Sequence, residues 1–403
     1  MGKPKIRFKG FTEDWEQRKF GDLGSVAMCK RIFKEQTAID GDIPFYKIGT
    51  FGNEPDSFIS KELFEEYKEK FQYPEVGDML ISASGTIGRT VEYTGEEAYF
   101  QDSNIVWFKH DERIDNLFLK CIYAIVQWSG IEGSTIKRLY NDNFLKTEFY
   151  MPSVFEQKQI GQYFSTLDYL ITLHQRKCDE TKKLKKYMLQ KMFPKNGMKV
   201  PEIRFEGFSD AWEQRKLGAL VDRVTRKNQD LVSELPLTIS AQYGLIDQNE
   251  FFDKRVASKD VSGYYLIENG EFAYNKSTST DAPWGAIKRL ERYENGVLST
   301  LYIVFRIKDD ASIDSDFLVS YYSTNLWHKG IHEIAAEGAR NHGLLNIAPT
   351  DFFDTKLAIP QDVEEQCRIG QCFTKLEALI TLHQRKCDEL VKIKKYMLQN
   401  MFV

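Results

Sequence analysis

Four loops of this chain place small polar residues beside basic side chains. They are Ser82–Arg89, Tyr274–Arg289, Gly133–Asn141 and Glu337–His342. Small residues let a backbone approach phosphate groups closely, and hydroxyl, amide and guanidinium groups can bond to base edges. We therefore predict DNA contacts from Ser82, Ser84, Gly85, Thr86, Arg89, Lys137, Arg138, Tyr140, Asn141, Asn275, Lys276, Ser277, Trp284, Lys288, Arg289, Arg340, Asn341 and His342. An ordinary polar surface loop is the alternative for any single residue, but basic and amide residues fall at corresponding loops in two parts of the chain.

Residue patterns that resemble catalytic sites are weak by comparison. Asp281–Trp284 resembles the Asp-Pro-Pro-aromatic turn of amino-methyltransferases, but the second proline is missing and no glycine-rich loop for a methyl donor opens a helix. Asp56 and Lys68 imitate the carboxylate and lysine of a metal-dependent nuclease, a spacing that arises easily in a charge-rich chain. His328 and His332 stand one helical turn apart without a third ligand. The sequence therefore predicts neither a catalytic site nor a metal site.

Composition is typical of a globular protein with more than one domain. The chain has 403 residues, of which 42% are hydrophobic and 28% charged, and a net charge of −4. A DNA-binding surface must therefore be a local concentration of positive charge. Six cysteines without a Cys-x-x-Cys pair favour neither a disulfide scaffold nor structural zinc. No apolar run is long enough to span a membrane, and the cytoplasm is the expected location.

The sequence contains an internal duplication. Residues Glu156–Phe193 and Glu365–Phe402 are identical at 27 of 38 aligned positions by direct count. Trp15–Lys19 and Trp212–Lys216 share the string Trp-Glu-Gln-Arg-Lys. The stretches between these shared blocks differ. The order variable, shared, variable, shared predicts two tandem halves.

The shared C-terminal blocks are predicted to form two long helices, over residues 154–195 and 361–403. Ser153 with Glu156, and Asp362 with Glu365, have the spacing of a capping box at the start of each helix. An apolar stripe at heptad-like spacing needs a partner helix, and the other copy is the nearest candidate. The predicted seam comprises Phe164, Leu167, Ile171, His174, Cys178, Leu184 and Met188 in the first copy, and Phe373, Leu376, Ile380, His383, Cys387, Ile393 and Met397 in the second.

Residues 1–153 and 196–360 are each predicted to form an α+β domain mounted on one of these helices. Short β-rich runs are bounded by Gly, Pro and Asp, and each domain continues into a helical stretch, Asn116–Trp128 or Asp316–His328. The β-rich runs are Ile43–Ile48, Met79–Ser82, Thr90–Tyr93, Ser103–Phe108, Leu237–Ser240, Glu271–Tyr274 and Thr300–Phe305. Trp15 and Trp212 are expected to anchor each domain entry in its core.

The motifs together resemble the specificity subunits of type I restriction–modification systems, over essentially the whole chain. The similarity includes the "WEQRKLG" domain start, the "GDMLISASGTIG" segment and the Pro-then-Glu-Gln entry to each long helix. The second half departs from the small-residue loop, having "GEFAYNKSTSTDAPWG".

This resemblance implies a non-catalytic DNA-recognition subunit without a cofactor of its own. Two target recognition domains would each recognise one half of a bipartite, asymmetric sequence in double-stranded DNA. The long helices would pack as an antiparallel coiled coil with pseudo-two-fold symmetry and dock two copies of a modification subunit, which binds S-adenosylmethionine and methylates adenine. A restriction subunit driven by ATP and Mg²⁺ would complete the nuclease.

Two other functions remain as alternatives. A fused DNA methyltransferase/nuclease would need donor-binding and catalytic motifs that the sequence lacks. A protein-binding scaffold on tandem helices would show no salt-sensitive DNA binding.

Overall fold

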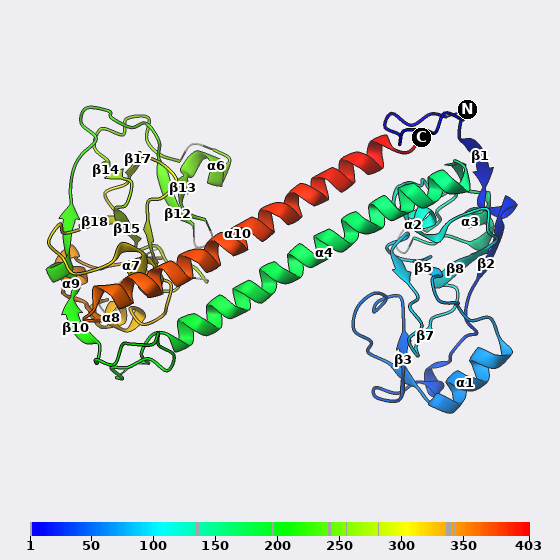
Figure 1. The fold of residues 1–403 in the computed structure, drawn as a ribbon, viewed down its shortest axis with the longest axis horizontal. Helices are drawn as coiled ribbons and strands as arrows, with labels where there is room; N and C mark the ends of the chain where they lie inside the picture. Colours follow the sequence, from blue (N-terminus) through cyan, green and yellow to red (C-terminus); the bar gives the residue numbers. More distant parts are fainter. Residues whose placement is uncertain are drawn as a thin grey trace. The chain divides into compact units, whose positions relative to one another are not determined.

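The computed structural model describes residues 2–133, 137–195, 197–240, 243–254, 256–280, 282–335, 340–341 and 343–403, the side chains of Arg340 and Asn341 excepted. The chain forms two compact units. Unit 1 comprises the residues up to Gln175 together with Gln384–Val403, and unit 2 comprises Arg176–His383. Each unit therefore contains one of the α+β domains and a part of both long helices (Figure 1). No helix among the described residues has the length and apolar character needed to cross a bilayer.

Unit 1 is organised around a four-stranded antiparallel sheet with the order β2-β8-β5-β6. Alternate side chains of its central strands enter two different cores, because successive strand residues point to opposite faces. Ile81 and Val106 pack with helix α2, whereas Leu80 and Ile105 pack with the small sheet β4-β3-β7 and helix α1. The bounds are β2 Gly24–Ala27, β3 Ile43–Tyr46, β4 Phe58–Ile59, α1 Lys61–Lys70, β5 Met79–Ser82, β6 Thr90–Glu92, β7 Tyr99–Phe100, β8 Ile105–His110, α2 Asn116–Ile125 and α3 Asn141–Lys146.

Unit 2 repeats this plan with different peripheral elements. Its four-stranded sheet has the equivalent order β11-β18-β15-β16. Phe272 and Phe305 face helices α7, α8 and α9, and Ala273 and Val304 face the opposite core. The bounds are α5 Leu217–Leu220, β11 Val221–Val224, β12 Leu237–Ser240, β13 Gly244–Asp247, α6 Gln248–Phe252, β14 Tyr265–Glu268, β15 Phe272–Asn275, β16 Ala286–Arg289, β17 Asn295–Leu298, β18 Ile303–Ile307, α7 Ser315–Tyr322, α8 His328–Ile334, β19 Arg340–Asn341, β20 Leu344–Leu345 and α9 Pro349–Asp354.

The repeated Glu-Gln-Arg-Lys string closes each α+β domain. In unit 1 it forms β1 (Glu16–Lys19), antiparallel to β9 (Glu148–Met151), the strand that precedes the first long helix. In unit 2 it forms β10 (Glu213–Lys216), antiparallel to β21 (Lys356–Ile359). The first and last strands of each domain are thus paired, which returns the chain to its starting edge before the long helix begins.

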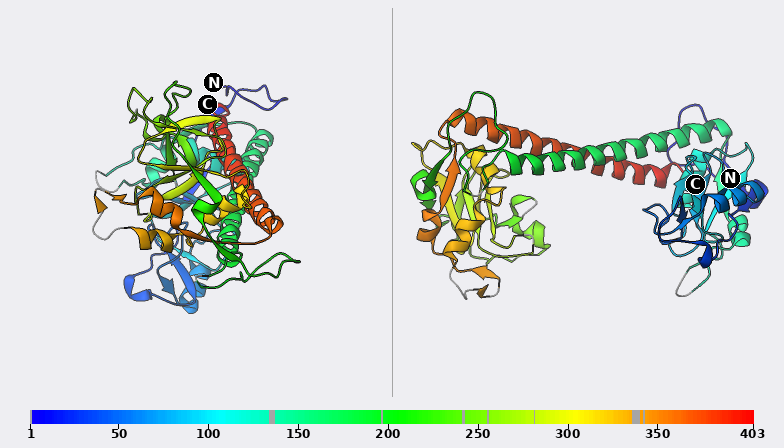
Figure 2. Two further views of the ribbon diagram at one scale, coloured as in Figure 1. Left: turned by 90° about the vertical axis from the view of Figure 1, so that its left-hand side faces the viewer. Right: turned by 90° about the horizontal axis from the view of Figure 1, so that it is seen from below.

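The two long helices are α4 (Val154–Lys191) and α10 (Val363–Asn400). Their segments pack antiparallel within each unit (Figures 1 and 2). In unit 1, Asp168 pairs with Lys394 and Gln175 contacts Cys387. In unit 2, Cys178 contacts the Ile380 carbonyl and Lys185 pairs with Glu377. The predicted antiparallel coiled coil is confirmed at the level of these segments. The pseudo-two-fold symmetry expected between the halves stays a prediction.

The predicted seam is correct in its first part and wrong at one position of each helix. Phe164, Leu167, Cys178, Phe373 and Cys387 are buried. Ile171, His174, Met188, Leu376, Ile380, His383 and Met397 are half-buried. Leu184 and Ile393, however, are 49% and 45% exposed.

The error arises from the step of six residues from Cys178 to Leu184, which leaves the heptad. A strict 3-4 spacing continues through Thr181, Lys185 and Met188 to buried Met192. Lys185 stays at the seam because it pairs with Glu377.

The C-terminal end of each long helix completes the core of one α+β domain, α10 in unit 1 and α4 in unit 2. In unit 1, Phe402 at the end of α10 packs against Trp15 and Phe118, with ring centroids 5.9 and 5.8 Å apart. In unit 2, Phe193 after α4 packs against Trp212 and Phe317, at 5.8 and 5.7 Å. Both tryptophans are at most 2% exposed, which confirms their predicted place in the core.

The chain termini follow from this packing. The Ile6 amide donates to the Asn400 carbonyl at 2.9 Å, so the N- and C-terminal segments lie side by side in unit 1 (Figures 1 and 2). The equivalent bond in unit 2 joins the Ile203 amide to the Lys191 carbonyl, also at 2.9 Å. The segment that follows α4 therefore has the same relation to α4 as the N-terminal segment has to α10.

The predicted capping boxes are only half formed. Ser153 accepts weakly from the Glu156 amide at 3.5 Å, and Asp362 accepts from the Glu364 amide at 2.8 Å. The side chain of Glu156 does not turn back to its own helix start. Instead it accepts two hydrogen bonds from Arg7, both 2.7 Å, with the carboxylate only 1% exposed.

Unit 2 has the equivalent pair. Arg204 donates to Glu365 at 2.7 and 2.8 Å, and this carboxylate is also 1% exposed. Hydrogen bonding to Glu156 raises the pKa of Arg7. The compensation of a buried carboxylate by a bidentate guanidinium fixes the N-terminal segment of each domain to its long helix.

The glutamine that follows each of these glutamates joins its long helix to the helix of the α+β domain. Gln157 accepts from the Asp115 amide at 2.9 Å and donates to the carbonyls of Arg113 and Pro152. Gln366 makes the same three bonds with Asp314, Ser312 and Pro360 in unit 2. Gly161 permits this close approach, since a Cβ there would lie 2.6 Å from the Leu117 Cβ.

Two predicted helices are shorter in the structure. Asn116–Trp128 is helical only to Ile125, and Asp316–His328 is interrupted after Tyr322. The hydroxyls of Ser323 and Thr324 donate to the Val319 and Tyr321 carbonyls and end α7. A separate helix, α8, begins at His328.

The packing of Phe402 and Phe193 predicts a crossed pattern of destabilisation. Phe402→Ala should reduce the stability of unit 1, although the residue follows the second α+β domain in sequence. Phe193→Ala should reduce that of unit 2. Each substitution empties a site in an aromatic core and is expected to cost about 3–5 kcal/mol. Hydrogen exchange followed by mass spectrometry resolves the two units; loss of protection confined to the sequence-adjacent domain in both variants would contradict the packing.

Candidate DNA interface

Two of the predicted loops in unit 1 lie side by side. The loop between β5 and β6 and the segment before α3 form a short antiparallel ladder centred on Ser84 and Arg138. The Leu139 amide donates to the Ala83 carbonyl at 2.8 Å, and the Gly85 amide donates to the Lys137 carbonyl at 2.9 Å. The chain separates these segments by some fifty positions, yet main-chain bonds make them one surface.

Ser82 and Ser84 hold this surface together from inside. Both are buried, at 1% and 4% exposure. The Ser82 hydroxyl donates to the Thr86 carbonyl at 2.6 Å and accepts from the Arg89 amide at 2.9 Å. The Ser84 hydroxyl donates to the side-chain oxygen of Asn104 at 2.7 Å. The prediction that these two hydroxyls face DNA is corrected, because burial and internal bonds occupy them.

The other predicted residues of unit 1 remain on the surface. Gly85, Thr86, Arg89, Lys137, Arg138 and Tyr140 are exposed, and Asn141 is half-buried at the first position of α3. One guanidinium nitrogen of Arg89 donates to the Phe51 carbonyl at 2.7 Å, which ties Arg89 to a neighbouring turn. Lys137 and Arg138 have no side-chain partner within the described part of the chain. Among the predicted basic residues of unit 1, they are the ones most available to an anionic ligand.

Unit 2 brings together the equivalent pair of loops. The Leu345 amide donates to the Lys276 carbonyl at 3.0 Å, and the Thr278 amide donates to the Gly343 carbonyl at 2.6 Å. Ser277 pairs with Leu344 across this ladder. Because β15 occupies the place in its sheet that β5 occupies in unit 1, both units build this surface from the same two topological positions.

The side chains around the unit 2 ladder differ in exposure. Ser277 is exposed, Asn275 is half-buried and accepts from the Ser277 amide, and Trp284 is half-buried against His332 with ring centroids 5.1 Å apart. Lys276 is half-buried, and its ammonium group lies 3.4 Å from the Ile347 carbonyl. Burial, and then the nearby Arg223, lower the pKa of Lys276.

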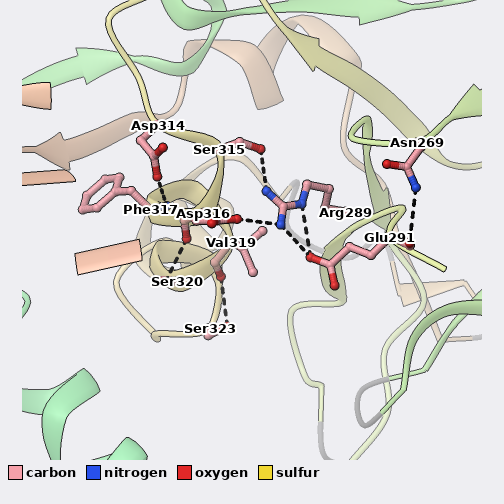
Figure 3. A network of polar contacts seen from close by, with 10 residues as sticks. All are labelled: Asn269, Arg289, Glu291, Asp314, Ser315, Asp316, Phe317, Val319, Ser320 and Ser323. Carbon is pink, nitrogen blue, oxygen red and sulfur yellow. Dashed lines mark hydrogen bonds and ion pairs between the residues drawn. The ribbon is translucent and has the colours of Figure 1, made fainter. Parts of the chain in front are cut away.

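Two predicted basic residues of β16 are half-buried. Burial, followed by repulsion from Lys185, lowers the pKa of Lys288, and Glu377 opposes this shift. Arg289 is only 16% exposed and donates to Ser315 and Asp316 at 2.7 Å and to Glu291 at 2.8 Å (Figure 3). Arg289 thus fixes the start of α7 to β16. The prediction of DNA contact is corrected for Arg289, since all three nitrogens of its guanidinium group already donate to Glu291, Ser315 or Asp316.

Arg340 and Asn341 form strand β19, which pairs with β20 in a hairpin beside the ladder of unit 2. His342 lies outside the described residues. In the two ladders, Gly343 and Leu344 hold the positions of Lys137 and Arg138, and the backbone places Arg340 and Asn341 on the strand that pairs with Leu344 and Leu345.

A third segment of unit 1 lies beside these two loops, and the sequence did not predict it. The turn Gln101–Asn104, between β7 and β8, contacts the same loop, since the Ala83 amide donates to the Asn104 carbonyl at 2.7 Å. The sequence pattern predicts a strand that begins at Ser103, whereas β8 begins at Ile105. Asp-Ser-Asn before a β-rich run is a turn signal that indicates this segment.

Within the described residues, no group of three or more His, Cys, Asp or Glu side chains is placed to hold a metal ion. The arrangement that the structure does show, exposed basic and hydroxyl groups on paired loops, suits an anionic polymer with hydrogen-bonding edges.

Residues 12–183 match the model of the type I restriction modification DNA specificity domain. A protein of Haemophilus influenzae Rd, described as a putative type I restriction enzyme specificity subunit S.HindORF215P, is 58% identical over 156 residues, which are 38% of this chain and 40% of that relative. The aligned region thus spans about two fifths of the curated relative's length. The crystal structure of a type I restriction-modification system S subunit from M. genitalium superposes with a TM-score of 0.63 at 14% identity, covering 99% of each chain. At that identity, the likeness concerns the fold.

The exposed basic residues generate a prediction for DNA binding. Lys137→Ala and Arg138→Ala should each weaken DNA binding and, where a phosphate contact is lost, reduce the slope of log affinity against log salt by roughly one. If Arg138 contacts a base with both nitrogens, its loss should instead cost about 1–3 kcal/mol at one base pair. Salt titrations by fluorescence anisotropy separate these cases. Lys61→Ala, which removes an exposed lysine at the start of α1, is the matched control. If both variants bind DNA with the affinity and salt dependence of this control, neither Lys137 nor Arg138 contacts DNA.

Proposed function

We infer from these matches and from the fold that the chain belongs to the family of type I restriction–modification specificity subunits. We propose that it recognises a bipartite, asymmetric DNA sequence, with one α+β domain for each half. The observation that carries the proposal is the duplication of one loop surface on equivalent positions of two sheets, with different side chains on each. Equal scaffolds with unequal loops are suited to two different base sequences.

The shared helices supply surfaces for protein partners. Leu184 and Tyr187 on α4 are 49% and 50% exposed, and their repeat equivalents Ile393 and Tyr396 on α10 are 45% and 57% exposed. Apolar side chains on the outside of a packed helix pair favour protein docking. We propose that these equivalent patches bind two copies of a modification subunit, and that restriction subunits join the resulting complex.

In this proposal the chemistry belongs to the partners. S-adenosylmethionine would be bound by the modification subunit, and ATP with Mg²⁺ by the restriction subunit, whereas this chain has no cofactor of its own. The complex would act in the cytoplasm. A fused methyltransferase/nuclease and a protein-binding scaffold are the competing functions.

Coexpression with a cognate modification subunit in a methylation-free host tests the proposal. Genome-wide mapping should show methylated adenines in one bipartite motif, and the isolated chain should methylate no DNA. Methyl transfer by the chain alone would favour the fused enzyme. Partner binding without any salt-sensitive DNA binding would favour the scaffold.

In this proposal, the length of α4 sets the length of the gap between the two half-sites. Four residues inserted after Lys183 add ~6 Å of helix and overshoot one turn by about 40°. One base pair adds ~3.4 Å and roughly 34–36° of twist. Rotational phase should dominate, because a recognition surface turned away from its groove loses its base contacts, whereas bending absorbs a few ångströms.

We therefore expect a gap longer by one base pair, with both half-site sequences intact. The same four residues inserted after Gly95, in an exposed turn of unit 1, should leave the gap unchanged. Methylome mapping decides between the outcomes. If an active variant with the α4 insertion methylates motifs with the original gap, the length of the helix does not determine the spacing.

A further inference from the structure

The turn between β7 and β8 has the properties of a third recognition segment in unit 1. Ser103 in this turn is exposed and has a left-handed backbone, with a φ of 53°. Main-chain bonds place Asn104, Ser84 and Arg138 on three adjacent segments: the Ala83 amide donates to Asn104, and the Leu139 amide donates to Ala83. Asn104 therefore lies on the surface that carries the exposed Lys137 and Arg138.

The charge of this turn is already compensated. Asp102 would repel a phosphate backbone, but Arg31 donates to its carboxylate at 2.8 Å. The carboxylate is 16% exposed, whereas the guanidinium is 60% exposed. The side of the turn that faces solvent is thus positive, which favours the approach of a nucleic acid.

The amide of Asn104 is held in one orientation. Its side-chain oxygen accepts from the Ser84 hydroxyl at 2.7 Å, and Ser84 is itself 4% exposed and cannot turn toward solvent. The Asn104 side-chain nitrogen donates to no acceptor within the described part of the chain, and the residue is half-buried rather than enclosed. Two N–H donors are therefore presented at the surface with their direction fixed by a buried hydroxyl.

We propose that Asn104 is a base-specifying residue of the first recognition domain and that Ser84 is the residue that positions it. Donors fixed in this way select a base edge that presents acceptors, such as N7 and O6 of guanine or O4 of thymine in the major groove. This inference rests on the proposed function, because it names one determinant of the sequence that the first domain recognises.

The corresponding turn of unit 2 supports a role in specificity rather than in folding. There the segment before β18 is Ser299–Tyr302, in which Thr300 and Leu301 are exposed, Leu301 at 56%. By the strand registers, Leu301 stands where Asn104 stands in unit 1, and Ser277 stands where Ser84 stands. The serine is therefore present in unit 2, but a leucine side chain offers it no acceptor and no donor to DNA. A contact needed only to hold the shared fold would be expected in both units, as the buried Arg–Glu pairs are.

The test uses the complex of this chain with its modification subunit and the motif mapped for the wild-type complex. Affinity is measured on duplexes that carry every single-base change in the motif. Asn104→Asp keeps the shape and the acceptor for Ser84 but removes both donors, so it should bind the wild-type motif about tenfold or more weakly. Gln72→Glu makes the same amide-to-acid change on an exposed residue before β5, at the opposite end of that strand, and should bind as wild type does.

Asn104→Ala and Ser84→Ala provide the specificity readout. Both should equalise affinity among bases to within about threefold at the same single position and leave every other position unchanged. Hydrogen exchange over β5 and β8 verifies that the sheet is folded in each variant. Unchanged discrimination at every position in folded Asn104→Asp and Asn104→Ala overturns the inference. A wild-type complex that neither methylates nor discriminates any motif overturns the proposed function itself, and the two failures are thereby distinct.

Discussion

The fold depends on two long helices, neither of which can bury its apolar stripe alone. Each helix ends in the core of the α+β domain that it does not directly follow in sequence. Each 38-residue helix carries aromatic residues near both ends. Phe164 of α4 packs in unit 1 and Phe193 after α4 packs in unit 2. The same holds for Phe402 and Phe373 of α10. Both long helices therefore contribute apolar side chains to each core, so each core depends on residues from distant parts of the chain.

The residues shared by the two halves are those that make this arrangement. The bidentate Arg7–Glu156 and Arg204–Glu365 pairs are buried, and breaking such a pair leaves an uncompensated charge that costs about 3–5 kcal/mol. Gln157 satisfies three main-chain groups at the junction with α2, and Gly161 leaves the space that the junction requires. These constraints act on both copies and explain why Glu156, Gln157 and Gly161 recur as Glu365, Gln366 and Gly370, independently of any partner.

The sequence predicted the scaffold better than the site, for physical reasons. Heptad periodicity and duplication identify α4 and α10 because each turn repeats the same requirement. The strands were found where both faces are buried, as in Met79–Ser82, since continuous apolar runs mark them. Leu184 was assigned to the seam because it is apolar, yet only the strict register shows that Lys185 lies there. Arg289 was assigned to DNA because basic residues near loops are normally free, and nothing local reveals its distant partners Ser315 and Asp316. The tertiary bond between Ser84 and Asn104 is likewise invisible in a sequence that separates them by twenty residues.

The way in which the loops are held permits their side chains to vary. In unit 1 the two loops are joined by main-chain bonds between Leu139 and Ala83 and between Gly85 and Lys137. In unit 2 they are joined by main-chain bonds between Leu345 and Lys276 and between Thr278 and Gly343. Such bonds do not depend on side-chain identity, so exchanging the exposed residues changes what the surface recognises without removing what fixes its shape. The scaffold, in contrast, is fixed by side chains. A protein organised in this way can acquire new surface chemistry at little cost in stability, provided that its helices and their buried ion pairs stay the same.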